Sequence, residues 1–144
     1  MNLPSFLFLG AIAGTLAAGA AMAAGFERLP DDEPMTVNGV DVACTGVGDE
    51  AKENPRWHDY SVRLEFAGGE RQYLADLDVS IVAANGDELL AVRCGGPWLL
   101  VQLQPGQYRV RATFEHHLTK TAAFTAPSHG QKRIVVAFPE VVGD

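Results

Sequence analysis

The two cysteines, Cys44 and Cys94, are the residues of this 144-residue chain with the most distinctive chemistry. A zinc site is excluded for them, because it needs more ligands and a C-x-x-C spacing that this chain lacks. The same spacing argues against a redox-active pair. In an oxidising compartment an isolated pair usually forms a disulfide, and free or intermolecular thiols are the alternative. We therefore expect a structural disulfide between Cys44 and Cys94.

Histidines are the second group of side chains that could bind a metal ion. His116 and His117 are adjacent at the tip of an expected hairpin, where neighbouring side chains point in opposite directions. His129 lies in an expected loop, and His58 precedes the first core strand. A surface metal site made by His116, His117 and His129 is the alternative to solvated loop histidines. We favour solvated histidines and expect no metal site and no cofactor.

Acidic and basic side chains also fall on common strand faces. Asp76 and Asp78 alternate onto one face together with Ser80, where they could form a cation site or an acid–base pair. A solvated outer face is the interpretation we favour. Arg109 and Arg111 point outward on another strand and are candidate ligands for an anion. Surface salt bridges are the interpretation we favour for both arginines.

Trp98 is the aromatic residue best placed to contact a ligand. It follows Gly95-Gly96-Pro97 and begins a strand near a loop end, where its indole could stack on a sugar or a peptide. The interpretation we favour is that the indole caps the core. Together with Arg109 and Arg111, Trp98 makes up the set of candidate binding residues.

The sequence lacks the common catalytic motifs. It contains no G-x-S-x-G, no H-E-x-x-H and no phosphate-binding G-x-x-x-x-G-K-[ST], so we expect no enzymatic activity. A net charge of −7 argues against a nucleic-acid partner, because phosphates need a concentrated basic surface. Residues 26–88 carry 15 acidic and 5 basic side chains, whereas residues 89–144 carry 3 and 6. We interpret this as complementarity between early and late strands, and an acidic docking surface for a cationic partner is the alternative.

Residues 1–24 are the expected signal peptide. They contain no charged side chain, and the apolar stretch from Phe6 to Leu16 is too short for a membrane span of about 20 residues. Ala21-Met22-Ala23 offers a cleavage site. No Lys or Arg lies near Met1, and an uncleaved anchor is the alternative. We expect a periplasmic or secreted protein without a transmembrane span after cleavage.

Residues 25–56 are expected to form an acidic leader and N-terminal segment. Phe26 to Pro34 is acidic and contains two prolines, which predicts a flexible leader. Met35 to Cys44 places valines around Asn38-Gly39 and predicts a short hairpin or edge strand. Gly46 to Pro55 is polar and predicts one helical turn.

Residues 57–140 read as a series of short strands with alternating apolar and polar side chains. Asn85-Gly86 predicts a type I′ hairpin turn, and a strand that is apolar on both faces predicts a buried central position. We expect an all-β fold, a Greek-key β-sandwich of seven to eight strands that is prealbumin-like or immunoglobulin-like, with a short helical turn near the N-terminus. The expected strands include Tyr60 to Phe66, Leu77 to Ile81, Glu88 to Arg93, the central Trp98 to Leu103, residues 107–115 and 118–125, and Lys132 to Phe138.

Several motifs lie in these strands and turns: Tyr73-Leu74-Ala75-Asp76, Asn85-Gly86, Gly96-Pro97-Trp98-Leu99-Leu100 and Leu103-Gln104-Pro105-Gly106-Gln107-Tyr108-Arg109-Val110. With them the chain resembles the carboxypeptidase regulatory-like domain, and its Gly46-Val47-Gly48-Asp49-Glu50 segment is similar to one that precedes the domain in stand-alone secreted proteobacterial members. The resemblance implies a transthyretin-like sandwich and no shared catalytic residues. At Cys94-Gly95 the chain departs from the family, whose members tend to have Ser-Asp at these positions. A lineage-specific disulfide would produce such a departure.

We therefore expect a non-catalytic, exported binding or structural module of the cell envelope. A protein-interaction module is the first hypothesis, because exposed edge strands can accept a strand from another envelope protein. A carbohydrate- or peptidoglycan-binding module, with Trp98 against a cell-wall glycan, is the alternative. A transthyretin-like hydrolase is a further alternative, although the chain lacks the Tyr-Arg-Gly-type tail of the hydroxyisourate hydrolases.

Overall fold

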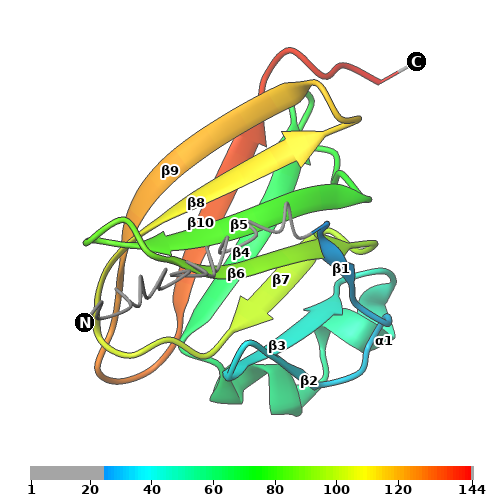
Figure 1. Ribbon diagram of the computed structural model, residues 1–144. Helices are drawn as coiled ribbons and strands as arrows, with labels where there is room; N and C mark the ends of the chain where they lie inside the picture. The colour runs from blue at the N-terminus through cyan, green and yellow to red at the C-terminus, as the bar shows by residue number, and fades with distance from the viewer. Residues whose placement is uncertain (1–24, 144) are drawn as a thin grey trace, which may run out of the picture.

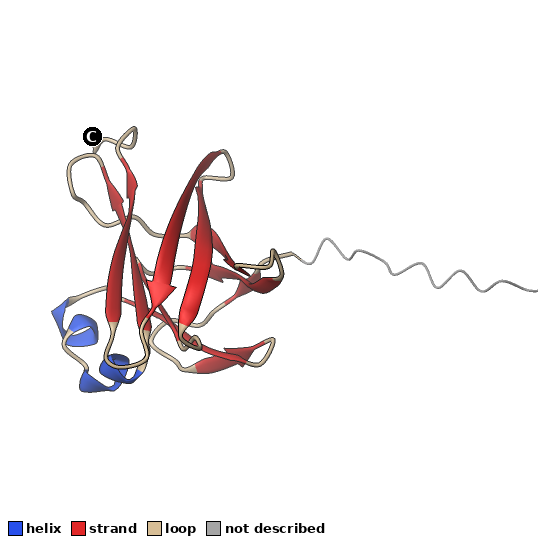
Figure 2. Cartoon of the chain, turned by 90° about the vertical axis from the view of Figure 1, so that its left-hand side faces the viewer, coloured by secondary structure: helices blue, strands red, loops and turns tan. Residues whose placement is uncertain are grey.

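Two five-stranded sheets pack face to face as a β-sandwich in the computed structural model (Figure 1 and Figure 2). The model describes residues 25–143, so the signal peptide expected at residues 1–24 lies outside the described residues. A short helix α1 (Asp49–Lys52) and a 3-10 helix η1 (Pro55–Asp59) lie between β3 and β4. The strands are β1 (Glu27–Arg28), β2 (Met35–Val37), β3 (Val40–Thr45), β4 (Val62–Gly68), β5 (Leu77–Ala83), β6 (Glu88–Cys94), β7 (Trp98–Val101), β8 (Gly106–Phe114), β9 (Leu118–Ala126) and β10 (Lys132–Phe138).

The connections between the strands confirm the expected fold class. Sheet A has the order β1-β6-β5-β8-β9, and sheet B has the order β10-β4-β7-β3-β2. After β4 the chain forms the β5–β6 hairpin in sheet A and returns to sheet B as β7 beside β4, which is a Greek-key connection. The described residues form ten strands, rather than the seven to eight we expected, because the segment before residue 46 contributes three.

The core between the sheets is built from alternate residues of the long strands. Leu77, Val79 and Ile81 of β5 are fully buried, as is Val110 of β8. Because successive side chains of a strand point to opposite faces, these residues face sheet B while their neighbours face outward. The inward positions predicted by the alternation are confirmed on both sheets. Their counterparts in sheet B are Val62, Leu64, Phe66, Leu99, Val101, Val136 and Phe138.

Strand β7 lies at the centre of sheet B and is buried on both faces, as its sequence predicts. Leu100 points away from the main core, and the indole of Trp57 covers it together with Ala43. Tyr60 does not begin a strand, although the expected range Tyr60 to Phe66 implied that it would. It precedes β4 and packs against this outer cluster. η1 therefore covers the outer face of sheet B at Leu100, which explains the apolar residue at this outward position of β7.

The segment expected to be a flexible leader is paired with the sandwich. β1 aligns in parallel with β6, placing Glu27 opposite Val92. Leu29 is only 2% exposed, and Asp31 forms a bridge with Cys44. Leu29, the backbone pairing and a hydrogen bond from the buried Thr45 hydroxyl to the Asp32 carboxylate hold this segment.

Two turns were predicted by Asn-Gly pairs, and they differ in type. Asn38 and Gly39 both have positive φ, at 51° and 76°, as a type I′ hairpin between β2 and β3 requires. Asn85 lacks a positive φ and only Gly86 has one, so the expected type I′ turn is wrong there. The side chain of Asn85 instead accepts a hydrogen bond from the Asp87 N–H, which holds the β5–β6 turn in another form.

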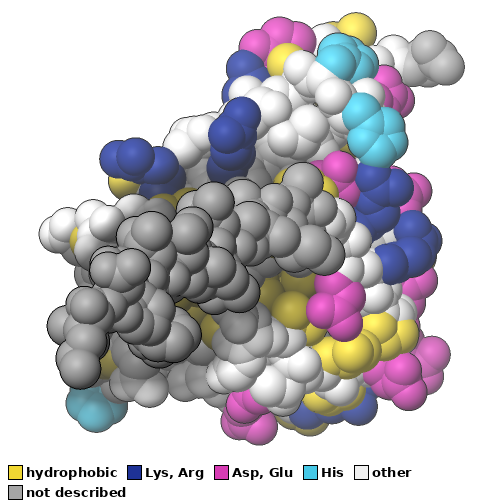
Figure 3. Space-filling model, in the orientation of Figure 1, with side chains coloured by type: hydrophobic (Ala, Val, Ile, Leu, Met, Phe, Trp, Pro, Cys, Tyr) yellow, Lys and Arg dark blue, Asp and Glu magenta, His cyan; other side chains and the backbone are white. Residues whose placement is uncertain are grey.

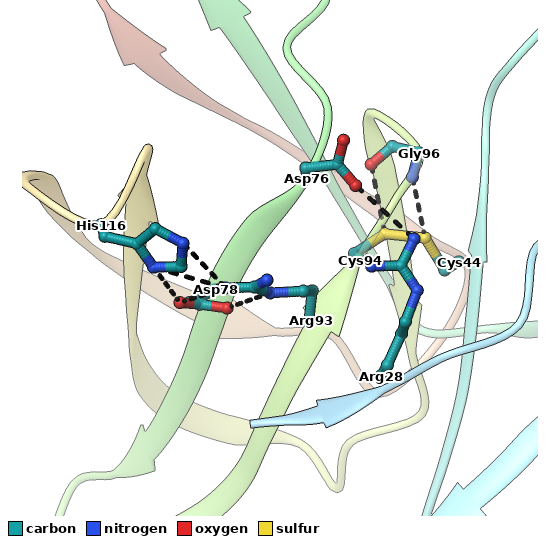
Figure 4. Close-up of polar contacts among 8 residues, drawn as sticks. All are labelled: Arg28, Cys44, Asp76, Asp78, Arg93, Cys94, Gly96 and His116. Atoms are coloured by element: carbon teal, nitrogen blue, oxygen red, sulfur yellow. Dashed lines mark hydrogen bonds and ion pairs between the residues drawn. A yellow bond between two sulfur atoms is a disulfide. The ribbon is translucent and has the colours of Figure 1, made fainter. Parts of the chain in front are cut away.

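The expected disulfide between Cys44 and Cys94 is present and crosses the core. Cys44 belongs to β3 of sheet B and Cys94 to β6 of sheet A, and both are fully buried. The Cys44 sulfur also accepts a hydrogen bond from the Gly96 N–H at 3.1 Å. The bond therefore links the two sheets covalently at the end of the sandwich where β7 begins (Figure 4).

Candidate functional site

Trp98 is placed differently from the exposed platform that a stacking role requires. It lies on the outer face of sheet B and is 6% exposed. The Arg63 guanidinium lies over its ring at 4.4 Å, and Gly46 packs against the same indole. The indole Nε1–H is buried and has no hydrogen-bond partner among the described residues. Trp98 therefore caps sheet B beneath Arg63, and the structure offers no ring face on which a glycan could stack.

Arg109 and Arg111 lie together on the exposed outer face of sheet A. Both belong to β8, opposite Ala123 and Thr121 of β9. Neither arginine forms a salt bridge with any residue in the range 25–143. Because Trp98 belongs to sheet B, the structure does not bring the three candidate residues into one site. The two arginines form a basic pair beside the edge strand β9.

Asp76 and Asp78 do not share a site, because each faces a different arginine (Figure 4). Asp78 accepts hydrogen bonds from Arg93 Nε at 2.8 Å and Nη2 at 3.1 Å. Hydrogen bonding to Asp78 raises the pKa of the Arg93 guanidinium, and the negative charge of Asp78 raises it further. Asp76 lies 3.8 Å from Arg28 of β1, in a largely exposed pair.

His116 approaches the same carboxylate, with its Nδ1 at 3.5 Å from Asp78 Oδ2. Figure 3 shows histidine side chains next to basic and acidic ones at the upper right of the view. His117 contacts its own turn instead, and His129 lies in the loop after β9 near His58. Across residues 25–143 no group of three or more His, Cys, Asp or Glu side chains could hold a metal ion.

A buried carboxylate on the outer face of sheet B was not singled out from the sequence. Glu65 of β4 is 1% exposed and accepts hydrogen bonds from Arg63 Nε at 2.9 Å and from Arg133 of β10. The hydrogen bond with Glu65 raises the pKa of Arg133. Only the parallel pairing of β10 with β4 brings Arg133 to this carboxylate, and the sequence contains no signal of that pairing.

A cavity lies between the β2–β3 hairpin and η1. Its volume is about 500 Å³, and its lining is mostly apolar but includes two acidic side chains. Three separate segments contribute, so no local motif could reveal it. The lining residues are Pro34, Met35, Thr36, Asp41, Arg56, Trp57, Asp59, Tyr60 and Gln102.

Local hydrogen bonds hold the walls of this cavity in place. η1 begins after Asn54, whose side chain accepts a hydrogen bond from the Arg56 N–H at 3.1 Å. Trp57 donates its Nε1–H to the Ala51 carbonyl at 2.7 Å, which ties η1 to α1. Gln102 accepts a hydrogen bond from the Ser61 N–H at 2.9 Å. The side chains that line the cavity are thus positioned before any ligand arrives.

The pKa of Tyr60 depends on burial and on the charged side chains around the cavity. Partial burial raises the pKa of its hydroxyl, and the carboxylates of Asp41 and Asp59 raise it further, against an opposing effect of Arg56. Arg56 also lines the cavity, where its guanidinium lies 4.2 Å from the centroid of the Trp57 ring and donates to the Asp32 carbonyl. Burial is the largest cause of the raised pKa of Tyr60, and the Asp41 carboxylate is the next largest.

In the part of the chain that the structure describes, no helix is long and apolar enough to cross a membrane. Comparison with models of known protein families finds none that matches the chain, and comparison with curated proteins finds no similar sequence.

Proposed function

We propose that this protein is a non-catalytic, exported β-sandwich module that binds another cell-envelope protein by adding a partner strand to β9. The observation that carries the proposal is the free edge of sheet A. β9 has nine residues and, among the described residues, pairs only with β8. Along such an edge every second residue directs its N–H and C=O groups away from the sheet. These groups are a template for a further strand.

The other edge strands of the two sheets are β1, β2 and β10. β10 has seven residues, but it begins with two charged residues, Lys132 and Arg133, and charge commonly protects an edge. β1 has two residues and β2 has three, which leaves few backbone groups for a partner. Natural edges are commonly protected by short length, charge or proline. β9 has no proline, and its one charged residue, Lys120, forms an ion pair with Glu140. Its outward side chains are uncharged: Thr119, Thr121, Ala123 and Thr125.

Arg109 and Arg111 favour a partner strand that carries acidic side chains. They lie on the neighbouring strand, directly opposite Ala123 and Thr121, and both are exposed. The small side chain of Ala123 leaves room for Arg109 to extend across β9 toward an added strand. A carboxylate on that strand would gain an ion pair that weakens with salt.

The export of the protein is supported by the disulfide and by the leader in the sequence. A fully buried disulfide between Cys44 and Cys94 suits an oxidising compartment such as the periplasm or the exterior. We also propose that the chain is a member of the carboxypeptidase regulatory-like family. The Greek-key sandwich fold supports this part of the proposal.

Copurification of the tagged protein from envelope fractions, with partners identified by mass spectrometry, tests the proposal. The substitution Ala123→Lys should reduce recovery of the partner, because it places a charge on the binding edge. Ala137→Lys is the matched control, since Ala137 is equally exposed on edge strand β10 of the other sheet. With the purified partner, amide hydrogen exchange should slow along β9. Equal binding by both variants, or protection that spares β9, would contradict strand addition.

A further inference from the structure

We infer that the cavity between the β2–β3 hairpin and η1 binds an alkylammonium group, such as the end of a lysine side chain. This inference does not depend on strand addition at β9, because the cavity is formed by residues beside sheet B and β9 belongs to sheet A. The sequence left an acidic docking surface for a cationic partner as an alternative, and this inference locates that surface at the cavity. We call this cavity the hairpin cavity below.

The shape and lining of the hairpin cavity suit an apolar stem. A volume of about 500 Å³ exceeds what one butyl chain occupies, and Pro34 and Met35 provide apolar walls. Trp57 forms part of the lining, and its ring centroid lies 6.3 Å from that of Tyr60. Methylene groups placed against these side chains would be removed from water, as happens for the stem of a buried lysine.

The charged side chains that line the hairpin cavity suit a cation at the end of that stem. Asp41 and Asp59 contribute two negative charges, and Arg56 contributes one positive charge that is already engaged with Trp57 and the Asp32 carbonyl. One Asp41 oxygen accepts a hydrogen bond from Thr36 at 2.7 Å, which leaves its second oxygen for a ligand. After burial, Asp41 is the largest cause that raises the pKa of Tyr60, which places its negative charge near the Tyr60 hydroxyl.

Other ligand classes fit the hairpin cavity less well. An anion would face both carboxylates, and their repulsion outweighs a single arginine that has other contacts. A divalent cation would find only two carboxylates, and no third His, Cys, Asp or Glu joins them among the described residues. An ammonium group can donate three hydrogen bonds, and the lining includes three side chains with acceptor oxygens, Asp41, Asp59 and Tyr60.

Titration of the whole protein with n-butylammonium chloride, followed by amide NMR, tests this inference. We expect binding with a dissociation constant on the order of 1 mM, as suits a ligand with so few atoms. The largest shifts should occur at Thr36, Asp41 and Tyr60, and binding should weaken as salt is added. Butan-1-ol and pentanoate have the same butyl stem without the positive charge. Equal binding of either one, or n-butylammonium shifts confined to other residues, would overturn the inference.

The substitution Asp59→Asn provides the sharpest variant, because no side-chain hydrogen bond within the described chain depends on Asp59. It should weaken n-butylammonium binding by about three- to fivefold. Glu88→Gln removes one exposed acidic charge at the start of β6, outside the hairpin cavity, and should leave binding unchanged. Equal affinities of the two variants would also overturn the inference.

A blocked lysine, acetyl-lysine methylamide, distinguishes a protein side chain from a free amine as the natural ligand. Its stem and charge match n-butylammonium, and it adds two peptide groups near the rim. Tighter binding of the blocked lysine favours a lysine of a partner protein, and weaker binding favours a free amine. Failure of both to bind the hairpin cavity would contradict the inference while leaving strand addition at β9 intact.

Discussion

Cys44 of β3 and Cys94 of β6 join the two sheets of the sandwich through a bond that no solvent reaches. Their α-carbons are 5.5 Å apart, although 50 residues separate them along the chain. The bond closes a loop that contains β4, β5 and both helices, so it restricts the unfolded chain over nearly half of the described residues. The stability of the fold should therefore depend strongly on oxidation.

The double substitution Cys44→Ala with Cys94→Ala should lower the free energy of unfolding by about 4 kcal/mol. This value follows from the chain entropy released when a loop of about 50 residues is opened. Urea unfolding of the oxidised protein and the variant measures the difference. A reduced sample of the unsubstituted protein is the control for cavity effects at the two sites. A loss below about 1 kcal/mol would show that the unfolded chain is not restricted by the bond.

The two tryptophans should respond differently to replacement by phenylalanine. Trp57 donates its Nε1–H to the Ala51 carbonyl, whereas the buried Nε1–H of Trp98 has no partner in the described chain. Trp57→Phe should destabilise the protein by about 1–2 kcal/mol more than Trp98→Phe, because only the first loses a hydrogen bond. Thermal unfolding of both variants measures this. The reverse order would mean that the Trp98 Nε1–H is bonded in solution.

Glu65 should be the most sensitive charged residue in the protein. It is almost fully buried and accepts from Arg63 and Arg133, so Glu65→Gln leaves two arginines without their anion. We expect a loss of about 1–3 kcal/mol in the free energy of unfolding. Arg133→Ala should cost less than about 1 kcal/mol, because the side chain of Arg133 is 57% exposed and Arg63 remains on the carboxylate. Denaturant unfolding compares the two, and equal losses would contradict this order.

The ionisation of Tyr60 should follow the charges of the hairpin cavity. Asp41→Asn and Asp59→Asn should each lower the pKa of Tyr60, Asp41→Asn more, and Arg56→Ala should raise it. Ultraviolet titration of tyrosinate, with Tyr60→Phe to assign the signal, measures these changes. Because the folded-state pKa is raised, the stabilisation linked to Tyr60 is complete below about pH 10 and is lost as the pH rises through the folded-state value. An unchanged pKa in Asp41→Asn would contradict the placement of the Asp41 charge near the Tyr60 hydroxyl.

Local patterns in the sequence determined the strands and most of their inward faces. Alternation in Leu77, Val79 and Ile81 identified the inward face of a strand, because side chains of a strand change sides at every residue. The Asn38-Gly39 pair similarly marked a hairpin, since its conformation depends only on two adjacent residues. The disulfide was predicted from the presence of two cysteines alone, without knowledge of which strands pair. Each of these features depends on interactions within a few residues or on chemistry alone.

The tertiary structure alone decided what covers the outer face of each strand. Alternation along β4 shows that Glu65 points away from the core, but it cannot show that Arg133 contacts this carboxylate. β7 is apolar on both faces, so only the structure shows that Trp98 faces outward and that Arg63 covers it. The hairpin cavity likewise needs η1 folded back over β3 and β7, which brings Asp59 to the β2–β3 hairpin. Such contacts depend on strand order and on the paths of the connections. Those follow from how the whole chain buries its apolar surface, which no short stretch of residues encodes.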